Sequence, residues 1–338
     1  MPQWRFAGTS KLLSKLLWPR AERGRLPIRK FCIKLIITFI ALTGLNACAL
    51  APWRSSPDVS KTPVDFTKSV RSADGVNIAY ETYGDGDTTL VFIHGWSCDR
   101  TYWRNQIEAF SEDYKIVLVD LAGHGASGAG RNTWSIEAFG DDVAAAARAA
   151  GARDIVLIGH SMGGPVALEA ARRLGPDIRG IIGVETLKTP GGGLKSEDAE
   201  AYWGRDRRAY ATRADKLVRA TFFLKGADAS LVDWVAADIA AAPPDIAIAS
   251  AIGNFTYDML GGLIATRNVP LILLNANTLP TDVAAHRDIR PTFSLFEFQD
   301  MGHFPMLEAP ETFNAVLREA LTDASQGALR VTTASTSY

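Results

Sequence analysis

Short apolar runs separated by helical segments are the feature that most restricts what this chain can fold into. Each run holds four to seven residues, mostly Val, Ile, Leu and Phe. The runs occupy residues 89–93, 115–119, 155–158, 178–184, 270–274 and 293–298. Such runs are typical of strands buried on both faces of a parallel sheet. Since helical segments separate them, they predict an α/β fold with a mostly parallel central sheet and helices on both faces.

The segments between the runs predict how the chain is divided. Residues 135–150, for example, repeat apolar side chains at spacings of three and four, as a helix does. The alternation of strands and helices breaks at residues 187–262, where the composition is helical and rich in aromatic residues. The predicted parts are therefore a core at residues 66–186 and 263–321, a helical lid at 187–262, and a polar, disordered tail at 322–338.

The N-terminal part has the composition of an export signal. Residues 1–34 carry nine of the 36 Lys and Arg residues and one acid, an apolar run spans 35–45, and small residues follow. This order is typical of a secretory signal peptide. We therefore expect a leader at 1–51 and a Pro- and Ser-rich linker at 52–65.

The end of the apolar run also holds a candidate modification site. Leu45-Asn46-Ala47-Cys48 resembles the lipobox of bacterial lipoproteins, although a smaller residue than Asn46 is usual there. The resemblance implies that Cys48 is lipidated and anchors an exported protein to a membrane of the cell envelope. The alternatives are ordinary cleavage to a periplasmic or secreted protein, an uncleaved membrane anchor, or no export.

A candidate nucleophile lies between the third run and the helix that follows it. Gly159-His160-Ser161-Met162-Gly163 is a G-x-S-x-G motif in a strand–turn–helix context. A sharp turn there holds the serine exposed, and the helix N-terminus favours negative charge. The motif predicts Ser161 as the nucleophile; the alternative is a tight turn with an inert serine.

Three motifs together carry a family resemblance. His94-Gly95-Trp96 follows the first run, an Asp120-to-Ser127 loop (DLAGHGAS) follows the second, and the Ser161 turn follows the third. The set resembles the α/β-hydrolase superfamily over roughly residues 66–320. The resemblance implies that the backbone N–H groups of Trp96 and Met162 form an oxyanion hole. His94, Asp120 and His124 are expected to brace their loops.

The general base must come late in the chain, because this superfamily orders its triad as serine, acid and histidine. Of the five histidines, His303 lies in a loop after the last run, residues 300–308 (DMGHFPMLE), which resembles the superfamily's final histidine loop. The resemblance therefore implies that His303 is the base. His286 lacks this context and is expected at the surface.

The acid of the triad is less evident from the sequence. The common superfamily pattern places an aspartate just after residues 270–274, where this chain has Asn275-Ala276-Asn277-Thr278-Leu279. Glu185 ends the run 178–184 instead, a position that carries the acid in some haloalkane dehalogenases on this fold. A carboxylate at the end of an apolar run is costly without a partner. We favour Glu185, and Asp282 on a longer loop stays open.

These residues predict a serine hydrolase that cleaves an ester or related acyl compound through an acyl-enzyme intermediate. A carbon–carbon bond hydrolase, thioesterase or peptidase is possible on the same site, and a ligand-binding or receptor protein without turnover is the alternative of a different class. We expect no metal or organic cofactor, since the histidines lack a ligand spacing. The expected partners are a small acyl substrate and a membrane; the net charge of −1 gives no sign of nucleic acid.

Overall fold

The computed structural model describes residues 67–191, 193–204, 207–290, 293–326 and 331–334. The predicted leader, the linker and Cys48 lie outside these residues. In the described ranges, no single helix has the length and hydropathy to cross a membrane. The helices Ala229–Ala241 and Pro244–Thr256 reach that length and hydropathy only when taken together, and the chain bends by 99° between them.

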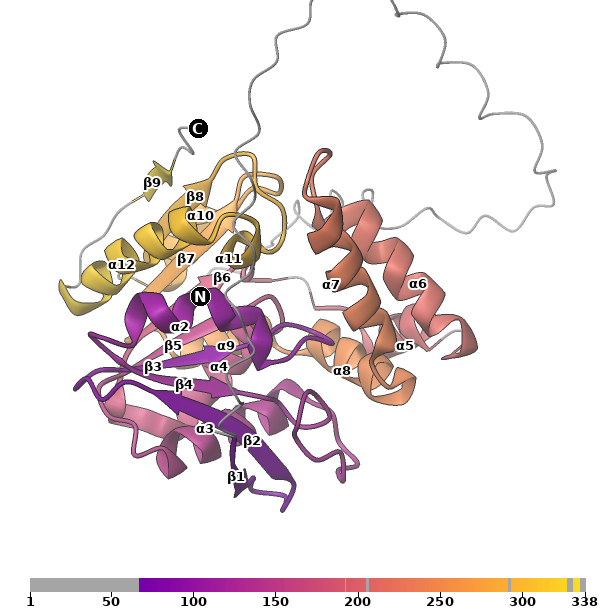
Figure 1. Cartoon of the computed structure of the whole chain (residues 1–338), viewed down its shortest axis with the longest axis horizontal. Coiled ribbons are helices and arrows are strands. Elements are labelled where there is room, and N and C mark those ends of the chain that lie inside the picture. The colour runs from indigo at the N-terminus through magenta and orange to yellow at the C-terminus, as the bar shows by residue number, and fades with distance from the viewer. Residues whose placement is uncertain (1–66, 192, 205–206, 291–292, 327–330, 335–338) are drawn as a thin grey trace, which may run out of the picture. The chain divides into compact units, whose positions relative to one another are not determined.

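One sheet forms the centre of the described chain (Figure 1). Its strands are β1 (Lys68–Arg71), β2 (Asn77–Tyr83), β3 (Thr89–Ile93), β4 (Lys115–Val119), β5 (Ile155–His160), β6 (Ile178–Val184), β7 (Leu271–Ala276), β8 (Phe293–Phe298) and β9 (Val331–Ala334). They lie in the order β1-β2-β4-β3-β5-β6-β7-β8-β9. β2 pairs antiparallel with β1 and β4, and the other neighbouring strands are parallel.

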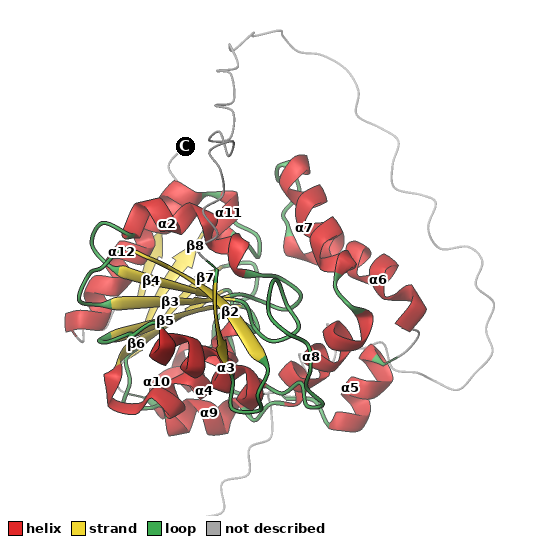
Figure 2. Cartoon of the chain, turned by 60° about the horizontal axis from the view of Figure 1, so that its bottom comes forward, coloured by secondary structure: helices red, strands yellow, loops and turns green. Residues whose placement is uncertain are grey.

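Helices cover both faces of the sheet (Figure 2). One face carries α2 (Arg104–Phe110), α11 (Pro305–Glu308) and α12 (Pro310–Gln326). The other carries α3 (Ile136–Ala149), α4 (Gly163–Leu174), α9 (Met259–Ala265) and α10 (Val283–Ile289). In β3, Phe92 packs into the first core and Val91 into the second, so successive side chains are buried on opposite faces. The predicted fold class is confirmed.

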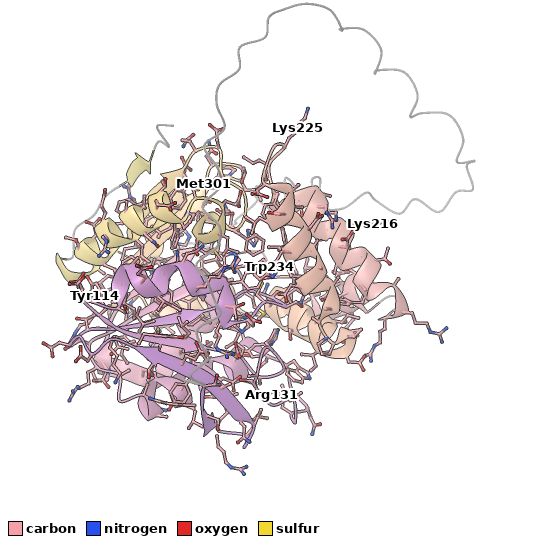
Figure 3. All side chains as sticks on the ribbon, viewed as in Figure 1. Tyr114, Arg131, Lys216, Lys225, Trp234 and Met301 are labelled. Atoms are coloured by element: carbon pink, nitrogen blue, oxygen red, sulfur yellow. The ribbon has the colours of Figure 1, made fainter. Side chains whose placement is uncertain are left out.

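The insertion between β6 and β7 contains a group of helices that lies to the right of the sheet in Figure 1. They are α5 (Ser196–Trp203), the 3-10 helix η3 (Arg207–Ala209), α6 (Tyr210–Leu217), the π-helix η4 (Val218–Phe222), α7 (Ala229–Ala241) and α8 (Pro244–Thr256). We call this group the lid. Trp234 of α7 is labelled in Figure 3. Its ring packs against Tyr102, with ring centroids 4.7 Å apart, and lies under the guanidinium of Arg104. These contacts join the lid to the core.

The structure differs from the sequence-based boundaries in three places. α9 begins inside the predicted lid but packs on α4 of the core. α12 continues to Gln326, and β9 pairs in parallel with β8, so the expectation of a disordered tail from residue 322 is wrong over these elements. β9 has the sequence VTTA and lies at the edge of the sheet, where a strand pairs with only one neighbour. Because this sequence is short and half polar, it is not recognised as an apolar run.

Candidate active site

Ser161 lies in the sharp turn between β5 and α4. Its φ of 51° is in the left-handed region, which a non-glycine residue adopts only where its surroundings hold it. The Ser161 N–H donates to Val184 O at 3.0 Å, and Thr186 Oγ1 donates to Ser161 O at 2.6 Å. Both bonds fasten the strained residue to the end of β6, so the serine hydroxyl is held on a rigid support.

The two glycines of the motif allow this turn to pack closely. A Cβ atom on Gly159 would overlap the carbonyl oxygen of Gly163. A Cβ on Gly163 would lie 2.6 Å from the carbonyl oxygen of Ile93, which belongs to the neighbouring strand. Any side chain at either position would therefore push α4 away from the sheet and displace Ser161.

The loop after β3 lies against Ser161. A Cβ on Gly95 would be 3.2 Å from Ser161 Cβ. His94 braces this loop as expected: its Nδ1–H donates to Gly95 O at 2.8 Å, and its Nε2 accepts from Leu121 N at 3.0 Å. Burial lowers the pKa of His94 to about 4, so the ring stays neutral in this arrangement.

Two backbone donors beside the serine are available for a ligand. Within the ranges that the structure describes, no hydrogen bond is found for the N–H of Trp96 or for that of Met162. Met162 precedes α4, whose N-terminus favours negative charge. Two free N–H groups beside a candidate nucleophile could stabilise an oxyanion.

Glu185 and His303 form a hydrogen-bonded pair. His303 Nδ1 donates to Glu185 Oε2 at 3.3 Å, and the side chain of Glu185 is only 5% exposed. Glu185 Oε1 also accepts from Lys188 Nζ at 3.0 Å and from the N–H of Ala276. Burial on its own would raise the pKa of Glu185, but the bond to His303, the charges of His303 and Lys188, and the Ala276 N–H together lower it. The carboxylate is therefore ionised at neutral pH.

The other candidate acid has a different role. Asp282 caps α10, accepting from Ala285 N at 3.0 Å, and makes no contact with His303 among the described side chains. Asn275, at the end of β7, accepts from Thr186 N at 3.0 Å and donates to Thr186 O at 3.1 Å. The residue at the usual acid strand thus holds the backbone beside Glu185 instead of contacting the histidine.

His286 is not a surface residue, contrary to expectation. Its side chain is buried, its Nε2–H donates to Leu187 O at 2.7 Å, and its ring stacks on Phe293 with centroids 4.7 Å apart. The short helix α10 packs this one ring against the sheet, and seven residues give too little periodicity to reveal its buried face.

The serine and the histidine are brought to the same site but are not bonded to each other. In the part of the chain that the structure describes, Ser161 Oγ makes no hydrogen bond. The His303 ring packs on Phe222 and His160, with centroids 4.7 and 4.8 Å apart. His160 directly precedes Ser161, so its contact with the His303 ring brings the histidine to the serine turn. Bonds between a nucleophile and its base are often long before substrate binds, so a missing Ser161–His303 hydrogen bond does not argue against such a pair.

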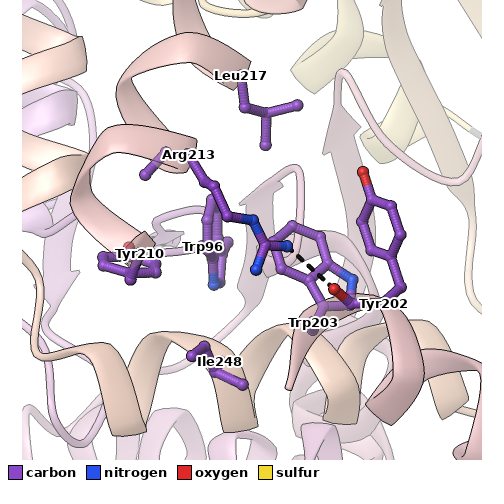
Figure 4. Close-up of a pocket in the computed structure, with 8 residues that line it drawn as sticks. Trp96, Tyr202, Trp203, Tyr210, Arg213, Leu217 and Ile248 are labelled. Atoms are coloured by element: carbon purple, nitrogen blue, oxygen red, sulfur yellow. Dashed lines mark hydrogen bonds between the residues drawn. The ribbon is translucent and has the colours of Figure 1, made fainter. Parts of the chain in front are cut away.

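An aromatic pocket adjoins the loop of Trp96 (Figure 4). It has a volume of about 50 Å³ and is formed by the core loop and three lid helices. The Trp96 indole donates to Ala247 O of α8 at 2.7 Å and packs edge-on against Trp203 at 5.2 Å. The lining residues are Trp96, Tyr202, Trp203, Tyr210, Arg213, Ala214, Leu217 and Ile248. The lining is mostly aromatic and aliphatic, with Arg213 as its one charged side chain.

Sequence reasoning missed several residues that contact the predicted site. They are Lys188 and Asn275 around Glu185, and Phe222 and Glu308 around His303. Only Lys188 had a usable signal, because a cation three residues after an isolated acid can pair with it locally. Among the described residues, no group of three or more His, Cys, Asp or Glu side chains is placed to hold a metal ion.

Comparison with known proteins identifies a family over most of the chain and relatives over shorter stretches. A profile described as "Alpha/beta hydrolase family" matches residues 90–316, more than half of the chain. A non-heme chloroperoxidase of Streptomyces lividans is 38% identical over 98 residues, 28% of this chain and 36% of that protein. A pimeloyl-[acyl-carrier protein] methyl ester esterase of Sodalis glossinidius is 31% identical over 109 residues, 32% of this chain and 40% of that protein. These alignments span well under half the length of either relative.

Solved structures agree on the fold. A thermophilic esterase from Thermogutta terrifontis superposes with a TM-score of 0.65, covering 77% of this chain and 99% of that one, at 24% identity. At that identity the likeness establishes the architecture and no more.

Proposed function

The chain belongs to the alpha/beta hydrolase family, and from this premise we propose that it is a serine hydrolase acting on an ester or related acyl compound through an acyl-enzyme intermediate. The observation that carries the proposal is the Glu185–His303 hydrogen bond at 3.3 Å beside the strained Ser161 turn. The esterase among the relatives supports the same class of reaction.

The proposed reaction follows from the positions of these groups. His303 takes the proton from Ser161 Oγ as the oxygen attacks the substrate carbonyl carbon, and the N–H groups of Trp96 and Met162 stabilise the oxyanion. The imidazolium then gives its proton to the leaving group. Water, activated by His303, hydrolyses the acyl-enzyme and restores Ser161. Glu185 holds the proton on Nδ1, so that Nε2 is the basic atom.

The environment of Glu185 supports its role as the acid. Its Oε1 is occupied by two donors, Ala276 N–H and Lys188 Nζ, which leaves Oε2 for His303. The pKa of Glu185 is lowered, so the carboxylate is charged when the imidazolium forms. The charge then stabilises that cation in a site with little solvent.

The test is Ser161→Ala, with Ser196→Ala, the exposed first residue of lid helix α5, as the matched control. Turnover of p-nitrophenyl esters should fall by about 10⁴ to 10⁶ in the first variant, since removing a triad member has this effect. A fluorophosphonate probe should label Ser161 in the wild type and the control. Unchanged turnover in Ser161→Ala, or labelling of another serine, would refute the mechanism. Absence of turnover with every acyl substrate, without labelling, would favour the ligand-binding alternative.

A further inference from the structure

Glu308 holds the backbone on both sides of His303. It is the last residue of α11, and its side chain turns back to the loop that precedes the helix. Oε2 accepts from Gly302 N at 3.0 Å, and Oε1 accepts from Phe304 N at 2.9 Å. A Cβ on Gly302 would lie 2.8 and 2.9 Å from the two carboxylate oxygens, so the carboxylate lies directly against the peptide chain.

The peptide groups of His303 itself are also bonded. Its N–H donates to Phe222 O of the π-helix at 2.7 Å, and its carbonyl oxygen accepts from His160 Nε2 at 2.7 Å. Three consecutive N–H groups, 302 to 304, and one carbonyl are thus held by three separate elements. Glu308 supplies two of these four bonds, and it is the one charged partner among them.

The charges around Glu308 matter for what this carboxylate can do. Burial raises the pKa of Glu308, and the negative charge of Glu185 raises it too, while the two N–H donors and the charge of His303 act in the opposite direction. Lys188 pairs with Glu185 Oε1, whereas His303 contacts Oε2. His160 packs on the His303 ring, and burial keeps its pKa well below the usual range, so it adds no charge. His303 therefore interacts electrostatically with two carboxylates, those of Glu185 and Glu308.

We propose that Glu308 is a positioning residue for the general base. Its carboxylate fixes the two peptide groups that flank His303, and its charge favours the imidazolium that forms when Ser161 loses its proton. The inference rests on the proposed function, because it assigns Glu308 a role in that same reaction. It adds a second carboxylate to the electrostatic environment of the base, one that reaches His303 through the backbone and through charge.

The test compares Glu308→Gln with Glu319→Gln, which removes an exposed carboxylate from α12. In Glu308→Gln the amide nitrogen faces one of the two N–H groups, so the loop should shift. A displacement of about 1 Å at a reacting group can cost about 10²-fold in rate. We expect kcat to fall 10- to 100-fold with KM changed less than about threefold. The acidic limb of the kcat/KM profile should move to lower pH, because a lost negative charge weakens proton binding by the imidazole.

Two further measurements keep the proposal falsifiable. Glu308→Asp keeps the charge but is too short to reach both N–H groups, so it should lower kcat and leave the acidic limb in place. The same kcat/KM profile measured for Glu319→Gln should keep its acidic limb, which shows that the shift is specific to Glu308. A folded Glu308→Gln with unchanged kcat and an unchanged acidic limb would overturn the role. If Ser161→Ala retains turnover, the proposed mechanism fails; if Ser161→Ala is inactive and Glu308→Gln is not impaired, only the positioning role fails.

Discussion

Glu185→Gln is the substitution that tests the site most sharply. The two side chains have the same shape, so the fold should be kept. Ala276 N–H and Lys188 Nζ both donate to Glu185 Oε1, and they will hold the amide oxygen of the glutamine at that position. The amide nitrogen must then face His303 Nδ1, which becomes an acceptor. The ring proton moves to Nε2, and the nitrogen that should take the serine proton is no longer basic.

The magnitude follows from the energy needed to reverse this orientation. Turning the amide over would set its N–H₂ group against two buried donors, and each lost bond costs on the order of 1–3 kcal/mol. The productive tautomer is thus disfavoured by about 2–6 kcal/mol, which corresponds to a rate loss of roughly 30-fold to 25,000-fold. The upper end matches the loss of about 10⁴ known for an aspartate-to-asparagine change in a serine protease triad.

The assay is kcat/KM for p-nitrophenyl esters, with Asp282→Asn as the matched control. Asp282 only caps α10, so its substitution should cost less than about threefold in rate, through a small loss of local stability. Circular dichroism and thermal melting should show both variants folded. If Asp282→Asn loses more activity than Glu185→Gln, the acid is not the carboxylate that the structure places beside His303, and the reasoning is wrong.

Three other predictions concern the lid, the core and the leader. Trp203→Ala enlarges the aromatic pocket and should raise kcat/KM for bulky acyl groups, relative to acetyl, by about 10-fold. Trp234→Ala is the control, because its ring packs outside the pocket, and it should leave this ratio unchanged. Equal changes in both variants would contradict a specificity role for the pocket. Asp142→Ala removes the buried partner of Arg131, leaving that guanidinium only the half-exposed Asp74, and also removes the acceptor of Ser72 Oγ and Ala122 N. It should lower the free energy of unfolding by about 3–5 kcal/mol in urea titrations. Asp141→Ala, in the more exposed pair with Arg173, should cost less than about 1 kcal/mol, and similar losses in both variants would be inconsistent with this account. We also propose that the protein is anchored in the cell envelope through a lipidated Cys48. Cys48→Ser should then release the protein from the membrane fraction or stop its processing, whereas Cys32→Ser should do neither. If the two variants fractionate alike, the lipobox interpretation is wrong.

Much of the architecture could be predicted because its signals are local. Strands buried on both faces are apolar throughout, so β3 to β8 were visible as runs, and the Ser161 motif lay at the junction of a strand and a helix. β1 and β9 were missed because edge strands can be short and polar. The pairing of Glu185 with His303 was predicted from resemblance, to the superfamily's final histidine loop and to the acid position of some haloalkane dehalogenases. Strand ends that meet at one edge of a parallel sheet make such a pairing possible.

The remaining features depend on contacts that no local pattern encodes. Which of Glu185 and Asp282 lies beside His303 depends on the loop after β7, where the side chain of Asp282 caps α10. The role of Asn275 in holding Thr186 involves residues 89 positions apart. Phe222 contributes to the His303 loop through a carbonyl oxygen, which every residue possesses, so its side chain gives no hint of this contact.

The four hydrogen bonds around His303 also determine when the site can assemble during synthesis, because all of their partners must first be translated. Their partners are residues 160, 222 and 308, which span 148 positions of the chain. At a synthesis rate of 5–20 residues per second, the ribosome needs roughly 7 to 30 s to go from the first partner to the last. Ser161 and Glu185 are made early in that interval, but the base is not yet present. Under the proposed mechanism, a nascent chain therefore cannot assemble its site until almost all of the sheet has been translated, and a product truncated before residue 303 is expected to be inactive.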